Sequence, residues 1–532
     1  MTATPNALPA AGALAALAIR HALVYDGTGR PPVTADVIIK DGLVAALDTT
    51  GSLNLTGIAQ FDATGLALAP GFIDVHTHSD GTILQCPAAD SRVSQGITTE
   101  VVGNCGFSSA CQENRRTHDD GSRETIWSDV RSYAAEVERR QPAVNIGTLC
   151  GHNTLRAMVV GHDPKPATPD QIRQMTTLLK NALDQGALGF SSGLAYIPGR
   201  FADTAEVQAI ATALRGTTKP YCTHMRDENA FIVEAIDEAS AIAAQGSGRL
   251  QISHLKVSGG PAHWHRFDEA VAAIDRARAA GVSVTADRYP YVFCETGLRQ
   301  VMPAPYADIH DLQTLFREHP ERRADAIGRL SQGLHPSWQT CDGWNSVILC
   351  NTGDPADRDF LGLSIAQIAV CRGMTPAEVC VDIIARTSAS AAYETMSQAN
   401  LDKFLQFPWL MPGSDGATTS FDYAVKRGHP RYFGTFPRFF RMARRYAPAT
   451  EIIRRMTSLP ADVFQLAGRG RVAVGSPADL VLFEEDTLDA GCDFAAPHTL
   501  ASGIRQTFVN GALAFDHENP ARRLRAGRFL FA

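Results

Sequence analysis

The feature that most constrains the fold is a long central region in which strand-like and helix-like segments alternate. Eight short, apolar, strand-like runs occur between residues 64 and 464, and helical stretches separate most of them. One of these stretches begins with Thr168-Pro169-Asp170, a good helix start, and ends at Gly186. Such alternation predicts the α/β class, and eight repeats favour a (β/α)8 TIM-like barrel.

Both ends of the chain lack this alternation and have the pattern of β-structure. Residues 17–62 contain short strand-like runs between turn signals, and the C-terminal part has a hairpin signal at Asn510-Gly511. Because chain termini often lie close together, the two ends are expected to pair in one small β-domain. The expected division is 1–63 plus 465–532 for that domain and 64–464 for the barrel. The long interval between Tyr291 and Leu410 predicts an inserted subdomain near 292–345.

Composition excludes several classes of protein. Of the 532 residues, 45% are hydrophobic and 20% are charged, which is typical of a globular protein rather than a disordered one. A formal net charge of −7 gives no global field to gather nucleic acid or an anionic membrane. The 11 cysteines have no framework spacing, and no apolar run is long enough to span a bilayer. We expect a soluble, cytoplasmic protein, a monomer or small homo-oligomer, that acts on a small molecule without nucleic-acid or membrane partners.

The first chemical signal is the pair His76 and His78, directly after a strand-like run. Residues i and i+2 of a strand point to the same face, so both imidazoles can reach one point. This pair alone is also compatible with two partly buried histidines.

The second signal is that further metal-ligand residues end other predicted strands: Cys105, His224, His254 and Asp415. In an α/β barrel, the carboxyl ends of the strands meet at one face, where active sites are built. Zinc accepts imidazole nitrogen, thiolate sulfur and carboxylate oxygen. Taken together, these positions predict a metal site, although Asp415 alone, in Ser414-Asp415-Gly416, is typical of a turn.

The motifs PGFIDVHTH, GNCG, THMRDE, ISHLK, PGSDG and HPRYFGTFPR resemble the amidohydrolase superfamily, specifically its N-acyl-D-amino-acid deacylase (D-aminoacylase) branch. The resemblance extends from about residue 17 to the end. It implies a (β/α)8 barrel with a small β-sandwich made from both termini, and one tightly bound Zn²⁺ with a possible second. It implies the following metal-site residues: His76, His78, Cys105, His224, His254 and Asp415. The fourth predicted strand, ALGFSSG, offers no lysine to bridge two metals, and Cys105 takes that place.

The resemblance also implies an activity. Zinc-activated water would hydrolyse the amide of an N-acyl-D-amino acid to a carboxylate and a free D-amino acid. Asp415 is our choice for the group that moves the proton. The D preference comes from the resemblance alone. The first alternative is another amide hydrolase of the superfamily, either a cyclic-amide (hydantoin-type) hydrolase or a dipeptidase, and a remote one is a non-catalytic binding protein on the same fold.

Substrate-binding residues are carried over in the same way. The resemblance implies that Lys256, Tyr289 and Arg431 bind the substrate carboxylate, and Arg and Lys suit that task. The alternatives are a solvated loop lysine and an arginine paired to a structural acid. We also expect His152 and His429 to line the pocket. Residues 416–430 are longer than this branch suggests, so no side-chain preference is carried over.

Overall fold

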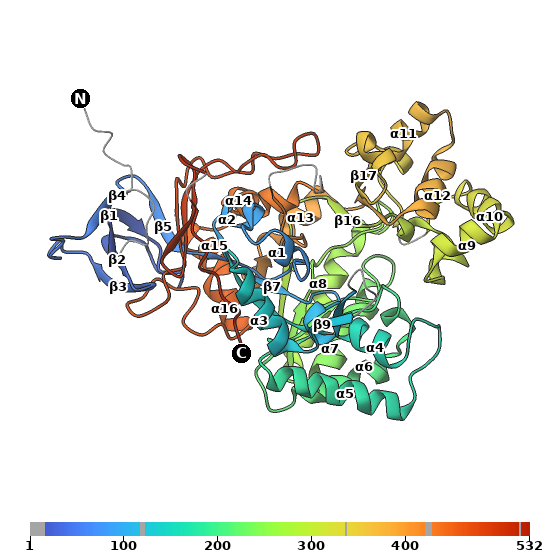
Figure 1. Ribbon diagram of the computed structural model, residues 1–532, viewed down its shortest axis with the longest axis horizontal. Coiled ribbons are helices and arrows are strands. Elements are labelled where there is room, and N and C mark those ends of the chain that lie inside the picture. The colour runs from blue at the N-terminus through green and yellow to red at the C-terminus, as the bar shows by residue number, and fades with distance from the viewer. Residues whose placement is uncertain (1–15, 118–122, 336–337, 421–427, 521–522) are drawn as a thin grey trace.

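The computed structural model describes residues 16–117, 123–335, 338–420, 428–520 and 523–532 (Figure 1). Strands from both ends of the chain form one eight-stranded sheet, in the order β22-β21-β20-β5-β1-β2-β3 with β4 paired to β1. These strands are β1 (Ala16–Val24), β2 (Val33–Lys40), β3 (Leu43–Asp48), β4 (Ala59–Asp62), β5 (Ala67–Pro70), β20 (Leu480–Phe483), β21 (Ile504–Val509) and β22 (Ala512–Asp516). The two ends meet where β20 runs antiparallel to β5. Asn510 and Gly511, both at positive φ, make the predicted turn between β21 and β22.

The central region contains two further sheets, ordered β10-β7-β6 and β11-β12-β13-β14-β15-β19, in which every pairing is parallel. Their strands are β6 (Phe72–Asp74), β7 (Ile97–Val102), β10 (Asn145–Thr148), β11 (Cys150–Gly151), β12 (Phe190–Gly193), β13 (Tyr221–His224), β14 (Arg249–Ile252), β15 (Ser283–Arg288) and β19 (Leu410–Pro412). An isolated parallel bridge between Thr77 and Gly416 links the segments that follow β6 and β19.

Helices follow most of these strands and cover them. They are α1 (Thr82–Gln85), α2 (Asp90–Val93), α3 (Val130–Arg140), α4 (His152–Val159), α5 (Pro169–Asp184), α6 (Thr204–Ala211), α7 (Ile232–Gln245), α8 (Phe267–Ala279), α13 (Gln398–Phe404), α14 (Arg431–Ala443), α15 (Ala449–Met456) and α16 (Ser458–Val463). The predicted start of α5 is confirmed, because the Thr168 side chain accepts a hydrogen bond from Gln171 N in a capping box. A small hairpin of β8 (Asn114–Thr117) and β9 (Arg123–Trp127) follows β7.

An inserted lobe, here residues 293–396, separates β15 from β19. It contains an antiparallel sheet in the order β16-β18-β17, with β16 (Phe293–Gly297), β17 (Val347–Thr352) and β18 (Ala389–Glu394). Its helices are α9 (Leu312–Glu318), α10 (Pro320–Leu330), α11 (Ile365–Arg372) and α12 (Pro376–Arg386). Met302, Phe316 and Val379 belong to its separate apolar cluster. In Figure 1 the lobe projects at the upper right, away from the sheet of the termini.

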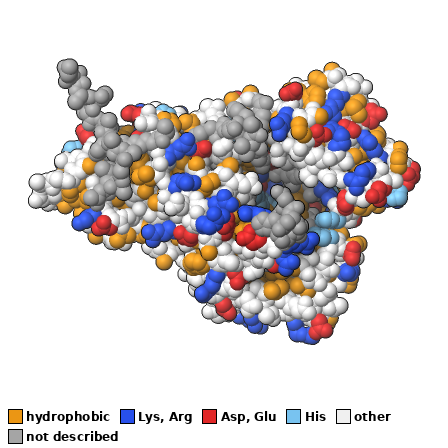
Figure 2. Space-filling view, in the orientation of Figure 1, with side chains coloured by type: hydrophobic (Ala, Val, Ile, Leu, Met, Phe, Trp, Pro, Cys, Tyr) orange, Lys and Arg blue, Asp and Glu red, His pale blue; other side chains and the backbone are white. Residues whose placement is uncertain are grey.

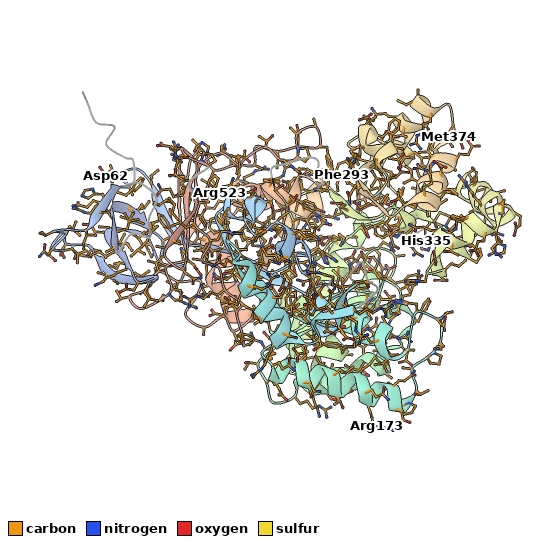
Figure 3. All side chains as sticks on the ribbon, in the orientation of Figure 1. Asp62, Arg173, Phe293, His335, Met374 and Arg523 are labelled. Carbon is orange, nitrogen blue, oxygen red and sulfur yellow. The ribbon has the colours of Figure 1, made fainter. Side chains whose placement is uncertain are left out.

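The inserted lobe contacts the central region near the ends of the parallel strands. Tyr196 Oη lies 3.4 Å from Thr296 Oγ1, and the rings of His162 and His310 stack with centroids 4.0 Å apart. Figure 3 shows Met374 at the outer side of the lobe, His335 nearer the centre of the molecule, and Arg173 of α5 at the opposite edge. The lobe is therefore placed to form one wall of any cavity at that end of the strands.

The surface in Figure 2 carries charged side chains of both signs over the sheet, the helices and the inserted lobe. None of the helices in the described part of the chain is both long enough and apolar enough to cross a membrane.

Candidate metal centre

Four of the predicted metal-ligand side chains converge just beyond the carboxyl ends of the parallel strands. The ligand atoms of His76, Cys105, His254 and Asp415 all lie within 4.8 Å of one another. Cys105 Sγ is 3.3 Å from His76 Nε2 and 3.5 Å from His254 Nε2. All four side chains are buried. Two imidazoles, a thiolate and a carboxylate are a donor set that suits zinc.

The other two predicted ligands adjoin this cluster. His78 Nε2 lies 3.0 Å from Asp415 Oδ1. The His224 ring, at the end of β13, packs edge-on against the His254 ring with centroids 4.3 Å apart. His224 Nδ1 is buried and has no hydrogen-bond partner among the described residues. A buried nitrogen without a partner costs free energy, which a bound metal ion would remove, so the side chains present fit a metal.

Three members of the cluster have a left-handed backbone conformation that non-glycine residues rarely adopt. The φ angles are 52° at Cys105, 36° at His254 and 49° at Asp415. Each such residue costs on the order of 1–3 kcal/mol and persists only where the surrounding structure holds it, commonly at functional sites. The backbone is therefore strained at three residues whose side chains belong to the same donor cluster.

Two acidic side chains hold the imidazoles from behind. His76 Nδ1 lies 3.0 Å from Asp287 Oδ1, and His254 Nδ1 lies 3.0 Å from Glu228 Oε1. Carboxylates in this position orient a histidine ligand and raise its basicity. Neither carboxylate was predicted from the sequence. Glu228 stands in the quoted motif THMRDE, four residues after His224, which is the one signal that could have drawn attention to it.

The charges in the cluster support one another. Burial raises the pKa of the Cys105 thiol, but the charges of His76 and His254 outweigh it and hold the pKa well below its usual range. For Asp415, burial is likewise outweighed, chiefly by the charge of Arg431, so the pKa of the carboxyl is well below normal. Both shifts favour the thiolate of Cys105 and the carboxylate of Asp415, which are the forms that bind a cation.

The three expected carboxylate-binding residues occupy different places. Arg431, at the start of α14, is 3% exposed, and its Nη1 lies 2.8 Å from Asp415 Oδ2. The guanidinium lies 4.8 Å above the Tyr289 ring, so Tyr289 supports it from below. Lys256 is also 3% exposed, and its Nζ donates to Glu228 Oε1 at 2.6 Å and to the His254 carbonyl at 3.2 Å. Lys256 therefore contacts residues of the metal cluster and is not a solvated loop residue.

The expected places of His152 and His429 at the substrate pocket stay predictions, and neither residue lines the two cavities described below. His152 is fully buried with its Nε2 3.0 Å from Glu206 Oε1. His429 is also buried; its Nδ1 accepts a hydrogen bond from Arg431 N at 2.9 Å, and its Nε2 lies 3.2 Å from the Phe293 carbonyl. His429 therefore helps to fix the backbone of Arg431 without facing the cavity.

A cavity of about 600 Å³ opens over the cluster, between the ends of the parallel strands and the inserted lobe. The strand side contributes Cys105, His254, Asp415 and Arg431, and the lobe contributes Glu295 and Arg299 among others. Its size is that of a typical small-molecule site. Ala417 also lines it, whereas residues 421–427 of the long segment after Asp415 lie outside the described residues.

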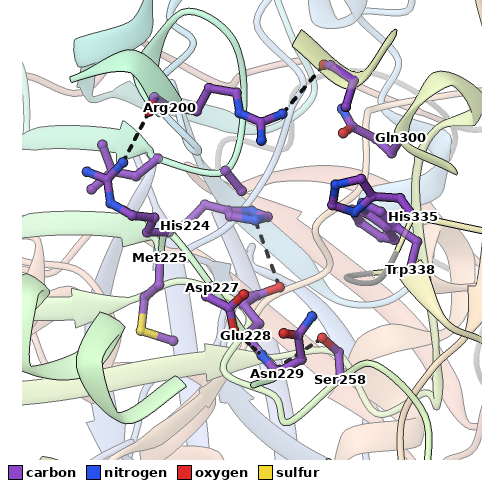
Figure 4. A pocket seen from close by; sticks show the side chains of 14 residues that line it. Arg200, His224, Met225, Asp227, Glu228, Asn229, Ser258, Gln300, His335 and Trp338 are labelled. Atoms are coloured by element: carbon purple, nitrogen blue, oxygen red, sulfur yellow. Dashed lines mark hydrogen bonds and ion pairs between the residues drawn. The ribbon is translucent and has the colours of Figure 1, made fainter. Parts of the chain in front are cut away.

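A smaller cavity of about 220 Å³ adjoins the cluster and is lined by His224, Glu228, Arg200 and His335 among others (Figure 4). In Figure 4 the His224 ring points into this space, with Glu228 below it and His335 across from it. The ligand-type side chains are thus accessible from two adjoining cavities, and Arg200 lines both.

Comparison with known proteins gives consistent results. A model of the amidohydrolase family matches residues 60–515. An N-acyl-D-glutamate deacylase of Alcaligenes xylosoxydans xylosoxydans is 33% identical, over 97% of this chain and 96% of that protein. A D-aminoacylase of the same organism is 31% identical, over 92% of each chain.

The solved structures agree. The N-acyl-D-glutamate deacylase of Bordetella bronchiseptica, solved with zinc and a phosphonate mimic of the tetrahedral intermediate, superposes with a TM-score of 0.79 at 31% identity, covering 97% of this chain and 99% of that one. A dihydropyrimidinase of Brevibacillus agri, with a TM-score of 0.56 at 16% identity, shares the fold alone. With near-complete coverage by sequence and by structure, the chain belongs to the amidohydrolase family and, within it, to the N-acyl-D-amino-acid deacylases.

Proposed function

We propose that this protein is a zinc-dependent deacylase that converts an N-acyl-D-amino acid and water into a carboxylate and a free D-amino acid. The observation that carries the proposal is the convergence of His76, Cys105, His254 and Asp415, the last three of which line a cavity together with Arg431. The relatives named for this reaction, one of them solved with zinc, support it.

We propose that zinc is held by the six residues that the sequence analysis singled out: His76, His78, Cys105, His224, His254 and Asp415. One ion would be bound tightly, and the resemblance implies that Cys105 would contact a second ion if one is bound. When bound, zinc supplies a Lewis acid that lowers the pKa of water to about 7 and polarises the carbonyl group that it touches.

Asp415 is the group that moves the proton. Asp415 lines the cavity beside the other donor atoms, so its carboxylate is placed to accept a proton from the attacking water. The water oxygen bonds to the acyl carbon, the C–N bond breaks, and Asp415 delivers the proton to the leaving nitrogen. The hydrogen-bonded His78 and the ion-paired Arg431 hold the carboxylate in place.

Arg431 is the best-placed side chain for the substrate carboxylate. It lines the cavity, whereas Lys256 and Tyr289 do not, and its Nε has no hydrogen-bond partner among the described residues. A guanidinium can hold a carboxylate through two parallel bonds while its other face rests on Tyr289. Lys256 would support the site indirectly, through its hydrogen bonds to Glu228 and to the His254 carbonyl.

The strand order supports a closed (β/α)8 barrel as the frame of this site. The strands are arranged as β6-β7-β10 and then β11 to β15 and β19, and the Thr77–Gly416 bridge brings the first and last together. The sheet of the termini would be the small β-sandwich of the family. In such a barrel the site lies at the carboxyl ends of the strands.

The test is hydrolysis of matched pairs of N-acetyl-D- and N-acetyl-L-amino acids by zinc-loaded protein, with a hydantoin as the cyclic-amide control. Release of free amino acid from the D series alone is the expected result. Faster turnover of the hydantoin or of the L series would overturn the proposal, and the chelator-treated protein serves as the blank for each assay.

A further inference from the structure

Glu228 occupies a central position behind the metal cluster. Its Oε1 lies 2.6 Å from Lys256 Nζ and 3.0 Å from His254 Nδ1, and its Oε2 lies 3.8 Å from His224 Nε2. The side chain is 8% exposed. One carboxylate thus contacts a buried ammonium and both of the imidazoles that end neighbouring strands β13 and β14.

The His254 ring has two nitrogens with different tasks. Its Nε2 faces Cys105 Sγ at 3.5 Å, on the side of the donor cluster. A neutral imidazole carries one proton, so Nε2 can bind a metal only if the proton is on Nδ1. Whatever contacts Nδ1 therefore decides whether the ring is a ligand.

Two groups compete for that nitrogen. Glu228 Oε1 lies 3.0 Å from Nδ1, and Lys256 Nζ lies 2.8 Å from it. A carboxylate only accepts hydrogen bonds and stabilises a proton on Nδ1, whereas an ammonium only donates and moves the proton to Nε2. The lysine alone would thus leave His254 in the tautomer that cannot bind zinc.

We propose that Glu228 is a positioning residue that keeps Nδ1 of His254 protonated against the competition of Lys256 and so leaves Nε2 free for the metal. Its second oxygen faces Nε2 of His224 and leaves the unpartnered Nδ1 of that ring for the metal as well (Figure 4). The proposal rests on the proposed function only in that the cluster binds zinc.

The rival interpretation is that Glu228 is itself a ligand, because His224, Glu228 and His254 also place ligand atoms within 4.8 Å of one another. Against it, Oε1 is engaged by Lys256 and lies at the Nδ1 side of His254, whereas Cys105 lies at the Nε2 side. The two interpretations predict different zinc stoichiometries and different effects of the lysine.

The chain offers a matched control. Glu206 is also buried, with its Oε1 3.0 Å from His152 Nε2 and 3.0 Å from Arg156 Nε. It is thus a carboxylate that holds one imidazole and one cation in the same central region, and it lines neither of the two described cavities. Glu206→Gln makes the same change of charge and shape as Glu228→Gln.

The first experiment measures zinc affinity of purified chains by competition with a chromogenic chelator, without any substrate. Loss of a partner that orients a metal ligand typically weakens metal binding by about 10- to 100-fold. We expect a loss of that size in Glu228→Gln and none in Glu206→Gln. Equal affinity in Glu228→Gln and wild type would contradict the proposal. If zinc binding stays tight but no substrate is hydrolysed, the proposed function fails and this inference stands.

The second experiment removes the competitor. In the double variant Glu228→Gln/Lys256→Met, the glutamine oxygen can accept a hydrogen bond from the Nδ1–H group, and no ammonium competes for Nδ1. Zinc affinity should return close to wild type, and the cobalt-substituted protein should regain the wild-type absorption spectrum. This variant leaves no unpaired buried charge, so it can be tested even if Glu228→Gln alone does not fold. Double-variant affinity as weak as that of Glu228→Gln, or a fall in zinc bound per chain at saturation, would overturn the proposal and favour Glu228 as a ligand.

Discussion

Two buried clusters in the central region have the same local chemistry and different surroundings. Glu228 holds His254 and Lys256, and Glu206 holds His152 and Arg156. The difference is at the other ring nitrogen. Nε2 of His254 faces Cys105, whereas Nδ1 of His152 is buried without a hydrogen-bond partner among the described residues. An acid–imidazole–cation cluster, or an unpartnered nitrogen, is thus no sign of a metal site until further donors converge on the same point.

The backbone conformations of His254 and His152 differ as well. His254 follows a strand in a strained conformation with a φ of 36°, and His152 is the first residue of helix α4. The strained turn aims a side chain at the cluster. The helix start directs the His152 ring towards Glu206 and Phe190 instead. This comparison can be tested by variants in both regions.

The largest effect is expected from Cys105→Ala. It removes the sulfur that lies between His76 and His254, so zinc retained after desalting should fall sharply, and activity with it. The control is Cys380→Ala, which removes a buried thiol from the core of the inserted lobe. Elemental analysis should find wild-type zinc in that control. Full zinc occupancy in Cys105→Ala would exclude the bridging role.

Asp415→Asn should affect chemistry more than metal binding. Removing a general acid/base typically lowers kcat by about 10²- to 10⁴-fold, since an amide cannot carry the proton. Steady-state kinetics of the zinc-loaded variant measure the loss, and elemental analysis checks that zinc remains. Turnover close to that of the wild type would assign the proton transfer to another residue.

Arg431→Ala should be the next in size. If the guanidinium binds the substrate carboxylate, its loss should cost about 2–5 kcal/mol of binding, much of it visible in kcat/KM. A substrate with an amidated carboxyl should be poor for the wild type and lose little more in the variant. Arg431 also pairs with Asp415, so Arg431→Lys should recover only part of the activity. Additive losses of the two changes would mean that Arg431 does not touch the carboxylate.

The smallest effect on activity is expected from His152→Gln. The variant weakens a buried contact to Glu206, which should destabilise the fold by about 1–3 kcal/mol and lower the Tm. Because His152 lines neither described cavity, kcat/KM and zinc content should stay near wild type. A large loss of kcat/KM without a change in Tm would return His152 to the substrate pocket.

The donor residues could be predicted from the sequence because position along the chain encodes position in space. His76, Cys105 and His254 each follow a strand, and parallel strands bring their carboxyl ends to one edge, so the donors meet whatever the loops do. The β-structure of both chain ends could also be predicted, from turn signals such as Asn510-Gly511, and both ends do pair in one sheet.

Contacts made inside loops could not be predicted in this way. Glu228 lies in the loop after β13, where no regular strand or helix spacing predicts its contact with His254. The position of Lys256 could not be predicted either, because its ammonium group donates a hydrogen bond to Glu228. His152 was expected at the pocket because it ends a predicted strand, whereas in the structure it is the first residue of α4 and its ring contacts Glu206 and Phe190. The resemblance supplied Arg431, though not its pairing with Asp415, because that contact joins side chains separated by the long segment after β19.

The cavity is lined by two separate parts of the molecule, and this has a consequence for how its substrate preference can evolve. The donors that line the cavity follow the parallel strands, whereas Glu295 and Arg299 belong to the inserted lobe, which has its own apolar cluster. Mutations in the lobe can therefore change which side chains a substrate meets while the residues that perform the reaction stay in register. Substrate selectivity can therefore change while the catalytic residues stay the same. A library of variants at the lobe residues that line the cavity is the natural starting point for changing the substrate preference of the enzyme.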